Sequence, residues 1–326
     1  MPPSECHDGG ESADSTIVLV SGLTEGVDDQ PVTKVTGGAQ PLGGEGPACV
    51  MEEKLDKLLG ITAVHELIGK GEFSSIYRCS VDGLGEVAVK TFSLGVSLRD
   101  VIYDLETIRH PNLVNVFRLN ATAPICIIME LCGPTLFQVL HQEIGDSFPM
   151  VALPEMRLAT AAGIISAVAY LHSHEILHRN IASSSCHASR EFGSEPVFKL
   201  GEFTMARSVS HAAMTKWTGN FVYMAPEVMD DDSYGFPTDV FSCGILLHEI
   251  ATRKLPYGGE SNPRLLVRVI RGHRPPASEL PELAGGSGDR RAELLTLLES
   301  CWDGKAESRT SSQEAAARLQ SLLLQE

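Results

Sequence analysis

The sequence predicts an α+β fold, in which strands come first along the folded part of the chain and helices follow. Residues 87–90 (VAVK) form an alternating segment, and residues 110–116 and 125–129 are short, apolar-rich runs of strand length. Apolar residues recur at helical spacing over 98–108, and residues 153–173 form a long apolar helix. The predicted strands thus come before the longest predicted helix, an order typical of an α+β fold.

Composition limits the size of the protein and the kind of partner it binds. The chain has 326 residues, 43% of them hydrophobic and 21% charged, which suits one large domain or two small ones. The formal net charge is −16, and such an acidic surface disfavours nucleic acid and anionic membranes as partners. We therefore expect protein partners.

Cysteine usage and hydropathy indicate the compartment. The eight cysteines form no CxxC pair and no metal-ligand spacing, so we expect free thiols in a reducing compartment. The apolar run Ile17–Val20 is too short for a signal peptide or a membrane span. The sequence predicts a soluble cytoplasmic protein that does not insert into membranes.

The first 60 residues differ from the rest of the chain. Residues 1–50 are rich in Gly, Ser, Pro and acids, and they hold too little apolar surface to offset the entropy of ordering. We expect a disordered acidic tail there. Residues 51–60 begin with an amphipathic segment, which predicts a short lead-in helix.

Two polar clusters lie in residues 176–207, whose sequence is ILHRNIASSSCHASREFGSEPVFKLGEFTMAR. The clusters are His178-Arg179-Asn180 and Gly201-Glu202-Phe203-Thr204. This stretch resembles the catalytic and metal-binding loops of the protein kinase family, which usually read H-R-D-L-x-x-x-N and D-F-G. The resemblance implies a two-lobed α+β fold, in which an antiparallel sheet with one helix forms the smaller lobe and helices form most of the larger lobe. It also implies that ATP is held between the lobes, near Mg²⁺.

Further motifs in the expected order strengthen the resemblance. Residues 67–77 (LIGKGEFSSIY) resemble the glycine-rich hairpin that covers the phosphates, and Lys90 corresponds to the lysine that contacts the α and β phosphates. Residues 130–133 resemble the hinge that contacts adenine, with Met129 as the gatekeeper behind it. The resemblance implies the following nucleotide-binding residues: Ile68, Gly69, Gly71, Ser74, Ile76, Ala88, Lys90, Met129, Glu130 and Cys132.

Motifs in the second half of the chain resemble structural parts of the same family. Residues 218–227 match the end of the activation segment, Asp239 matches the buried aspartate that ties down the catalytic loop, and Arg309 matches a late arginine that pairs with Glu227. The resemblance covers residues 61–322, with the smaller lobe about 61–131 and the larger about 132–322. The sequence is most similar to the tyrosine-kinase-like group.

The departures from the family pattern fall on the residues that carry the chemistry. Asn180 stands at the position of the catalytic aspartate, Ser185 at that of the metal-binding asparagine, and Glu202 at that of the D-F-G aspartate. An amide is not basic, and loss of a positioned general base costs about 10²–10⁴ in rate. Ser185 and Glu202 are also altered ligands for Mg²⁺. The site residues to test are thus Lys90 and Asn180 for catalysis, and Glu202 and Ser185 for metal.

Other positions bear on this interpretation. In the family, a glutamate on the following helix pairs with the phosphate-contacting lysine, and that position is Val101 in this sequence. We therefore expect Lys90 to pair with Asp100 or Asp104, or with no residue of that helix. Arg179 is retained, and in the family it holds a phosphorylated activation segment; the alternative is that it anchors the loop by hydrogen bonds.

The sequence favours a pseudokinase, that is, a kinase domain with retained ATP-cleft elements that acts as a signalling scaffold or allosteric regulator of other signalling proteins or kinases. The alternative is a weakly active ATP-dependent serine/threonine kinase that uses Glu202 for metal and Lys90 for phosphates.

Overall fold

A computed structural model describes residues 60–324, except residues 72, 94–102, 122–124, 143, 145–147, 149–151, 191–195, 209–219, 231–234, 261–262 and 284–288. The expected acidic tail lies outside these residues, and so does the lead-in helix apart from Gly60. Both stay predictions.

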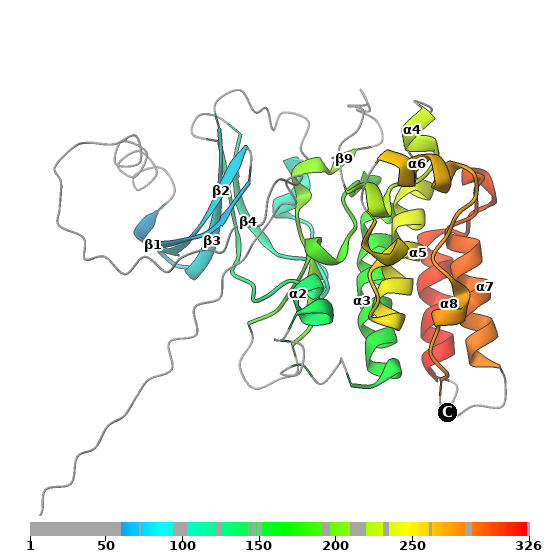
Figure 1. The fold of residues 1–326 in the computed structure, drawn as a ribbon. Helices are drawn as coiled ribbons and strands as arrows, with labels where there is room; N and C mark the ends of the chain where they lie inside the picture. The colour runs from blue at the N-terminus through cyan, green and yellow to red at the C-terminus, as the bar shows by residue number, and fades with distance from the viewer. Residues whose placement is uncertain are drawn as a thin grey trace, which may run out of the picture.

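The first part of the described chain forms one antiparallel sheet with the strand order β1-β2-β3-β5-β4 (Figure 1). A tight turn joins β2 to β3, and Gly83 and Gly85 in it have φ of 76° and 77°, a conformation that side chains disfavour. The strands are β1 Ile61–Lys70, β2 Ser74–Val81, β3 Gly85–Phe92, β4 Val116–Asn120 and β5 Cys126–Glu130.

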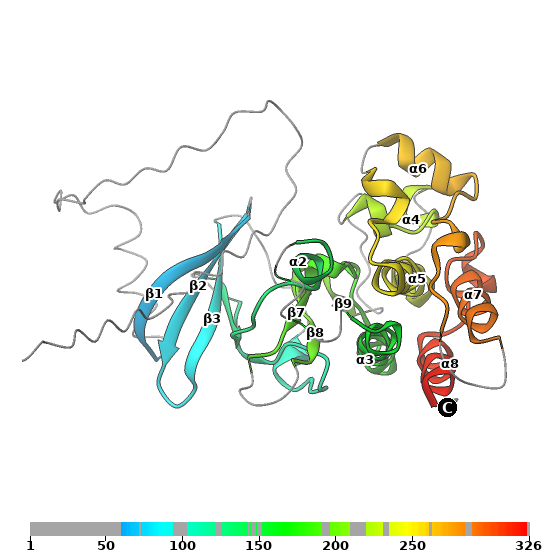
Figure 2. The same ribbon diagram turned by 60° about the horizontal axis from the view of Figure 1, so that its bottom comes forward.

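The second part is mostly helical, with α3 and α5 at its centre and α7 and α8 beside them (Figures 1 and 2). Its apolar side chains form a continuous buried core that also reaches the sheet. The helices are α2 Leu136–His141, α3 Pro154–Ser173, α4 Glu227–Asp230, α5 Phe236–Thr252, α6 Pro263–Ile270, α7 Arg290–Cys301 and α8 Ser312–Leu324.

Short strands lie between the sheet and the helices (Figure 2). Strand β6 (Ile176–Leu177) pairs with β9 (Arg207–Ser208), and β7 (Cys186–Ala188) pairs with β8 (Phe198–Leu200). They deliver the two polar clusters of residues 176–207 to the region between the sheet and the helical part.

The fold class is confirmed: a five-stranded antiparallel sheet precedes a mostly helical region. The long helix predicted over 153–173 is α3, and the strand predicted over 125–129 is β5, one residue further on. In the part of the chain that the structure describes, no helix combines the length and apolar character needed to cross a bilayer.

The strand predicted over 110–116 is wrong, because β4 begins only at Val116. The preceding residues form turns and a loop whose apolar side chains are nevertheless buried: Leu113 makes a single parallel bridge to Leu200, and Val114 N–H donates to Leu200 O at 2.9 Å. Burial against β8, and not strand pairing along the sheet, explains the apolar run.

The helix predicted over 98–108 lies outside the described residues up to residue 102, and over 103–108 the prediction of an α-helix is wrong. Its described part is a 3-10 turn, Tyr103–Glu106, followed by a loop. Leu105 and Ile108 are buried there, as their spacing predicts.

Candidate functional site

Lys90, on the central strand β3, points toward the helical part of the molecule and is bound there. Its Nζ donates to Glu202 Oε2 at 2.7 Å and to Thr204 Oγ1 at 3.1 Å. Only 7% of Lys90 is exposed, so the pair is largely shielded from water. Lys90 therefore has partners on the segment after β8, outside the helix that the sequence analysis considered. Asp100 and the side chain of Asp104 lie outside the described residues.

Glu202 is presented by a sharp change of direction after β8. Gly201 N–H donates to Ser185 O at 2.8 Å, and a Cβ on Gly201 would lie 3.0 Å from Val114 Cγ2. Glu202 itself has φ 61° and ψ 46°, the left-handed conformation that costs about 1–3 kcal/mol in a residue with a side chain. The close packing of Gly201 and the bond to Lys90 keep the carboxylate in this place.

The electrostatics of Glu202 follow from these contacts. Burial alone raises the pKa of its carboxyl, but the charge and hydrogen bond of Lys90 outweigh burial, so the pKa lies below its usual value. Glu202 is therefore a carboxylate at neutral pH. The buried ion pair joins the sheet to the segment after β8, 112 residues away in the chain.

Asp239, near the start of α5, holds the loop after β6. Its Oδ2 accepts from His178 N–H at 2.8 Å and from His172 Nε2 at 3.0 Å, and its Oδ1 accepts from Arg179 N–H at 2.9 Å. Burial opposes ionisation, but the hydrogen bond and charge of His172, with help from His178, lower the pKa of Asp239. The prediction that this aspartate ties down the loop is confirmed.

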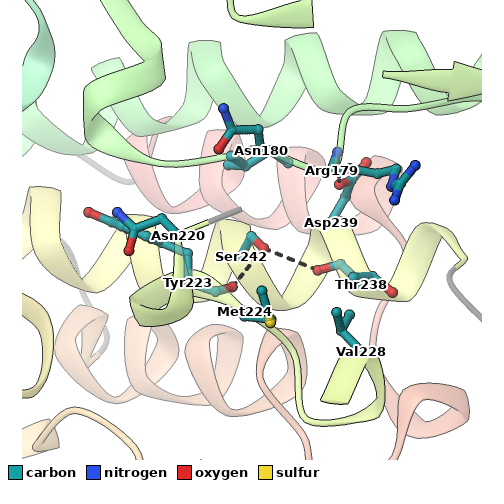
Figure 3. A pocket seen from close by; sticks show the side chains of 10 residues that line it. Arg179, Asn180, Asn220, Tyr223, Met224, Val228, Thr238, Asp239 and Ser242 are labelled. Atoms are coloured by element: carbon teal, nitrogen blue, oxygen red, sulfur yellow. Dashed lines mark hydrogen bonds between the residues drawn. The ribbon is translucent and has the colours of Figure 1, made fainter. Parts of the chain in front are cut away.

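A small pocket lies beside this loop, with a volume of about 20 Å³, which is enough for about one water molecule. Figure 3 shows Asn180 from the loop after β6 and Asn220 from the segment before Phe221–Tyr223 among its lining residues. Asn220 Oδ1 accepts from Val222 N–H at 3.1 Å, so that amide is anchored. Among the described residues, Asp239 is the one acid that lines the pocket, and both of its oxygens already accept backbone or histidine N–H groups.

Ser185 ends a 3-10 turn, Ser183–Ser185, and is 2% exposed. Its carbonyl accepts from Gly201 N–H, which fixes the spacing between the two loops. A hydroxyl this deeply buried is poorly placed to serve a hydrated ion. Among the described residues, no three His, Cys, Asp or Glu side chains gather closely enough to hold a metal ion.

The sequence reasoning missed a second buried cluster next to Ser185. Ser183 Oγ donates to Glu249 Oε1 at 2.8 Å, and the same oxygen accepts from His141 Nε2 at 2.9 Å. Tyr223 OH donates to Glu249 Oε2. Glu249 is completely buried, and this unusual placement of an acid on the apolar helix α5 is the one signal that the sequence offered.

The sheet side of the site contains the predicted nucleotide-binding residues. Ile68, Ser74 and Ile76 are half-buried in β1 and β2, and Gly71 N–H donates to Ser74 O at 2.8 Å to close the turn. A Cβ on Gly69 would lie 3.4 Å from Ile76 Cδ1. A Cβ at this distance would be close to ordinary van der Waals contact, so packing within the hairpin does not by itself require glycine at position 69.

The rim of the site is formed by the end of β5 and the residues that follow. Ala88 pairs with Met129 across β3 and β5, and Met129 packs on the main core. Glu130 does not face solvent freely: both of its carboxylate oxygens accept from Lys199 Nζ, at 2.7 and 2.9 Å. Burial raises the pKa of the Cys132 thiol to about 12, and the nearby Glu130 charge adds to this effect.

An aromatic contact and a predicted ion pair add to these connections. His178 and Phe203 meet edge to face with ring centroids 5.6 Å apart, and Leu105 belongs to the same buried core. Arg309 donates to both carboxylate oxygens of Glu227, at 2.6 and 2.7 Å, so that predicted ion pair is confirmed.

The sheet, the helical part and the two loops between them define the class of protein: a two-lobed domain with a protein kinase fold. Comparison with known families agrees, because the family described as "Protein kinase domain" matches residues 62–319. The chain belongs to the protein kinase family.

Curated relatives include kinases of both specificities. The chain is 29% identical to the human tyrosine-protein kinase Fer over 272 residues, which cover 78% of this chain and 30% of that protein. It is 29% identical to the serine/threonine-protein kinase STY46 of Arabidopsis thaliana over 271 residues, covering 78% of this chain and 43% of that protein. The chain thus spans less than half the length of these relatives.

Proposed function

We propose that this protein is a pseudokinase, which binds a nucleotide between its lobes and acts as a signalling scaffold or allosteric regulator without transferring phosphate efficiently. The observation that carries this proposal is the pocket beside Asn180. Among the described residues, its lining includes the neutral amides of Asn180 and Asn220 and the carboxylate of Asp239. Both oxygens of that carboxylate already accept hydrogen bonds.

The chemistry of phosphoryl transfer explains why this pocket matters. A kinase orients the acceptor hydroxyl with a carboxylate that also takes its proton. Asn180 can orient a hydroxyl but cannot accept the proton, and Asp239 would have to give up bonds to the loop backbone in order to act. Loss of the base costs about 10²–10⁴ in rate.

The residues present fit a nucleotide better than they fit Mg²⁺. ATP binding is general in the protein kinase family. The backbone of the β1–β2 hairpin at Gly69 and Gly71 and the ammonium of Lys90 would hold the phosphates of ATP, once Lys90 leaves Glu202. The metal positions fit poorly, because Ser185 is buried and Glu202 is bound to Lys90.

A weakly active ATP-dependent serine/threonine kinase is the second candidate. One observation favours it: Glu202 is ionised, and so it keeps a negative charge at the position of the metal-binding aspartate.

A single-turnover autophosphorylation assay with Mg²⁺ or Mn²⁺ separates the two candidates. We expect no incorporation by the wild-type chain. Incorporation that Lys90→Met abolishes would overturn the pseudokinase proposal, whereas incorporation that survives this change would reveal a contaminating kinase.

Nucleotide binding is tested by thermal unfolding with ATP, in the presence and absence of Mg²⁺. We expect ATP to raise the unfolding temperature in both conditions and Lys90→Met to abolish the increase. No increase at millimolar ATP would end the nucleotide part of the proposal, and proximity labelling that recovers no kinase or other signalling protein would end the scaffold part.

A further inference from the structure

Helix α6 (Pro263–Ile270) has one buried face and one exposed face. Leu265, Leu266 and Val269 are buried against the helical lobe. On the opposite face, Val267 is 48% exposed and Ile270 is 44% exposed, although each is a large apolar residue. Arg264, Arg268 and the following residue Arg271 are exposed beside them, at helical spacing. We call these five exposed residues the α6 face.

The α6 face is basic in a protein that is acidic overall. Residues 253–274 contain six Lys and Arg and a single acid, Glu260, in a chain of net charge −16. Glu260 forms an ion pair with Arg268, and Lys254 forms one with Glu279 at 3.1 Å. Arg274 binds the backbone carbonyls of Val269 and Trp302 and supports the helix from within. Six basic residues against one acid make the segment positive in an otherwise acidic chain.

Helix α6 is connected to the candidate functional site through a neighbouring turn. Helix α6 contacts the Phe221–Tyr223 turn, which directly precedes the Ala225-Pro226-Glu227 end of the activation segment. Figure 2 shows α6 beside α4 at the outer end of the helical lobe. The α6 face therefore lies on the outer side of a helix that contacts the Phe221–Tyr223 turn, and Tyr223 lines the Asn180 pocket.

The chain itself contains a segment with complementary chemistry. Residues 11–29 (ESADSTIVLVSGLTEGVDD) hold five acids and no Lys or Arg. The apolar run Ile17–Val20 lies between the acids, so that apolar and negative groups alternate along the segment as apolar and positive groups do on the α6 face. Opposite charge would fix the segment, and Val267 and Ile270 would cover its apolar run.

The connecting chain is long enough for this contact. About 40 residues separate Val20 from the first strand at Ile61. A random-coil chain of about 40 residues would have an end-to-end distance of roughly 35 Å. A folded domain of about 260 residues has a radius of gyration of roughly 18 Å. The segment can therefore reach α6 from the sheet lobe, at an effective concentration of order millimolar.

We propose that residues 11–29 bind in cis to the α6 face and cover the surface next to the end of the activation segment. Acidic nucleic acid and anionic membranes carry the same charge as the occupant, but the overall charge of −16 repels them. Residues 11–29 are repelled less strongly than an added polyanion, because their own negative charge is already included in the net charge of the chain.

The contact is tested on the full chain with a photo-cross-linking amino acid in place of Val20. We expect cross-links to residues 263–271, at a yield that is independent of protein concentration and falls at 0.5 M NaCl because salt screens the charges. The double variant Arg264→Glu, Arg271→Glu should reduce the yield at least tenfold. Val267→Ser, which leaves the charge unchanged, should reduce it about threefold.

The matched control is Arg109→Glu, Arg190→Glu, which makes the same charge change at two exposed residues outside α6; Arg190 contacts Glu86 in the sheet lobe. It should leave the yield unchanged. Cross-links elsewhere in the chain, or an equal loss in the control, would overturn the proposal. Cross-linked dimers whose yield rises with concentration would assign the α6 face to a second copy, and no cross-link at all would assign it to another partner; either result rejects binding in cis.

Discussion

Lys90 Nζ lies 2.7 Å from Glu202 Oε2, and this contact joins the central strand of the sheet lobe to the segment after β8. Lys90 and Glu202 stand at the positions where the family carries its phosphate-contacting lysine and its metal-binding aspartate, and in this protein the two side chains bind each other. The lobes are joined a second time, with the charges reversed, by Glu130 at the end of β5 and Lys199 in β8.

The coupling between Lys90 and Glu202 can be measured in a double-mutant cycle with Lys90→Met and Glu202→Gln. We expect a coupling free energy of about 1–3 kcal/mol from urea unfolding, because the pair is largely buried and each single change leaves a polar partner unsatisfied. The same cycle on Lys254 and Glu279, an exposed pair, should give no more than about 1 kcal/mol. Equal values for both pairs would contradict the assignment.

Release of Lys90 should strengthen metal-free nucleotide binding. We expect Glu202→Gln to lower the Kd for ATP in EDTA about tenfold, because Lys90 is then free to meet the phosphates and one repelling charge is gone. Fluorescence titration measures this change. The control is Glu86→Gln, at an exposed acid on β3 that bonds Arg78. A Kd that is unchanged or higher in Glu202→Gln would show that the pair does not compete with nucleotide.

The Arg309–Glu227 pair should dominate the stability of the helical lobe. The Arg309 side chain is completely buried and donates two hydrogen bonds to the carboxylate. Arg309→Ala should reduce the free energy of unfolding by about 3–5 kcal/mol, since it leaves a partly buried carboxylate unpaired. Arg190→Ala, which removes a solvent-exposed contact to Glu86 of 4.0 Å, should cost less than about 1 kcal/mol.

His178 should make the stability depend on pH below neutrality. Burial lowers the pKa of His178, although the charge of Asp239 opposes this effect. Its ring is neutral in the fold: Nε2–H donates to Gly201 O at 2.7 Å, and Nδ1 accepts from Asn180 N–H at 3.3 Å. The folded pKa lies below the unfolded value of about 6.5, so the unfolded chain binds more protons as the pH falls through that value.

The contribution of His178 to the free energy of unfolding should therefore be fully present above about pH 6.5. Below that pH the free energy of unfolding should decrease, by up to about 1.4 kcal/mol per pH unit for this residue. His178→Phe should lower the stability at pH 7.5 but flatten the curve between pH 6.5 and 5. His174→Phe, at an exposed histidine, serves as the control. An unchanged slope in His178→Phe would contradict the expected titration.

Much of the architecture could be predicted because it depends on patterns that are local in the sequence. The apolar segment over 153–173 predicted α3, and the motif spacing predicted both the Glu227–Arg309 pair and the contacts of Asp239. The strand predicted over 110–116 failed for a physical reason: an apolar run reports burial, and burial against β8 requires no strand pairing within the sheet.

The sequence by itself determined the two-lobed fold and the identity of the altered residues, because side-chain periodicity and motif spacing are properties of the chain. Only the tertiary structure decided which charges meet. Lys90 and Glu202 are 112 residues apart, and Glu130 and Lys199 are 69 apart. Such pairs form where packing brings elements together at low dielectric, and no local pattern specifies that distance.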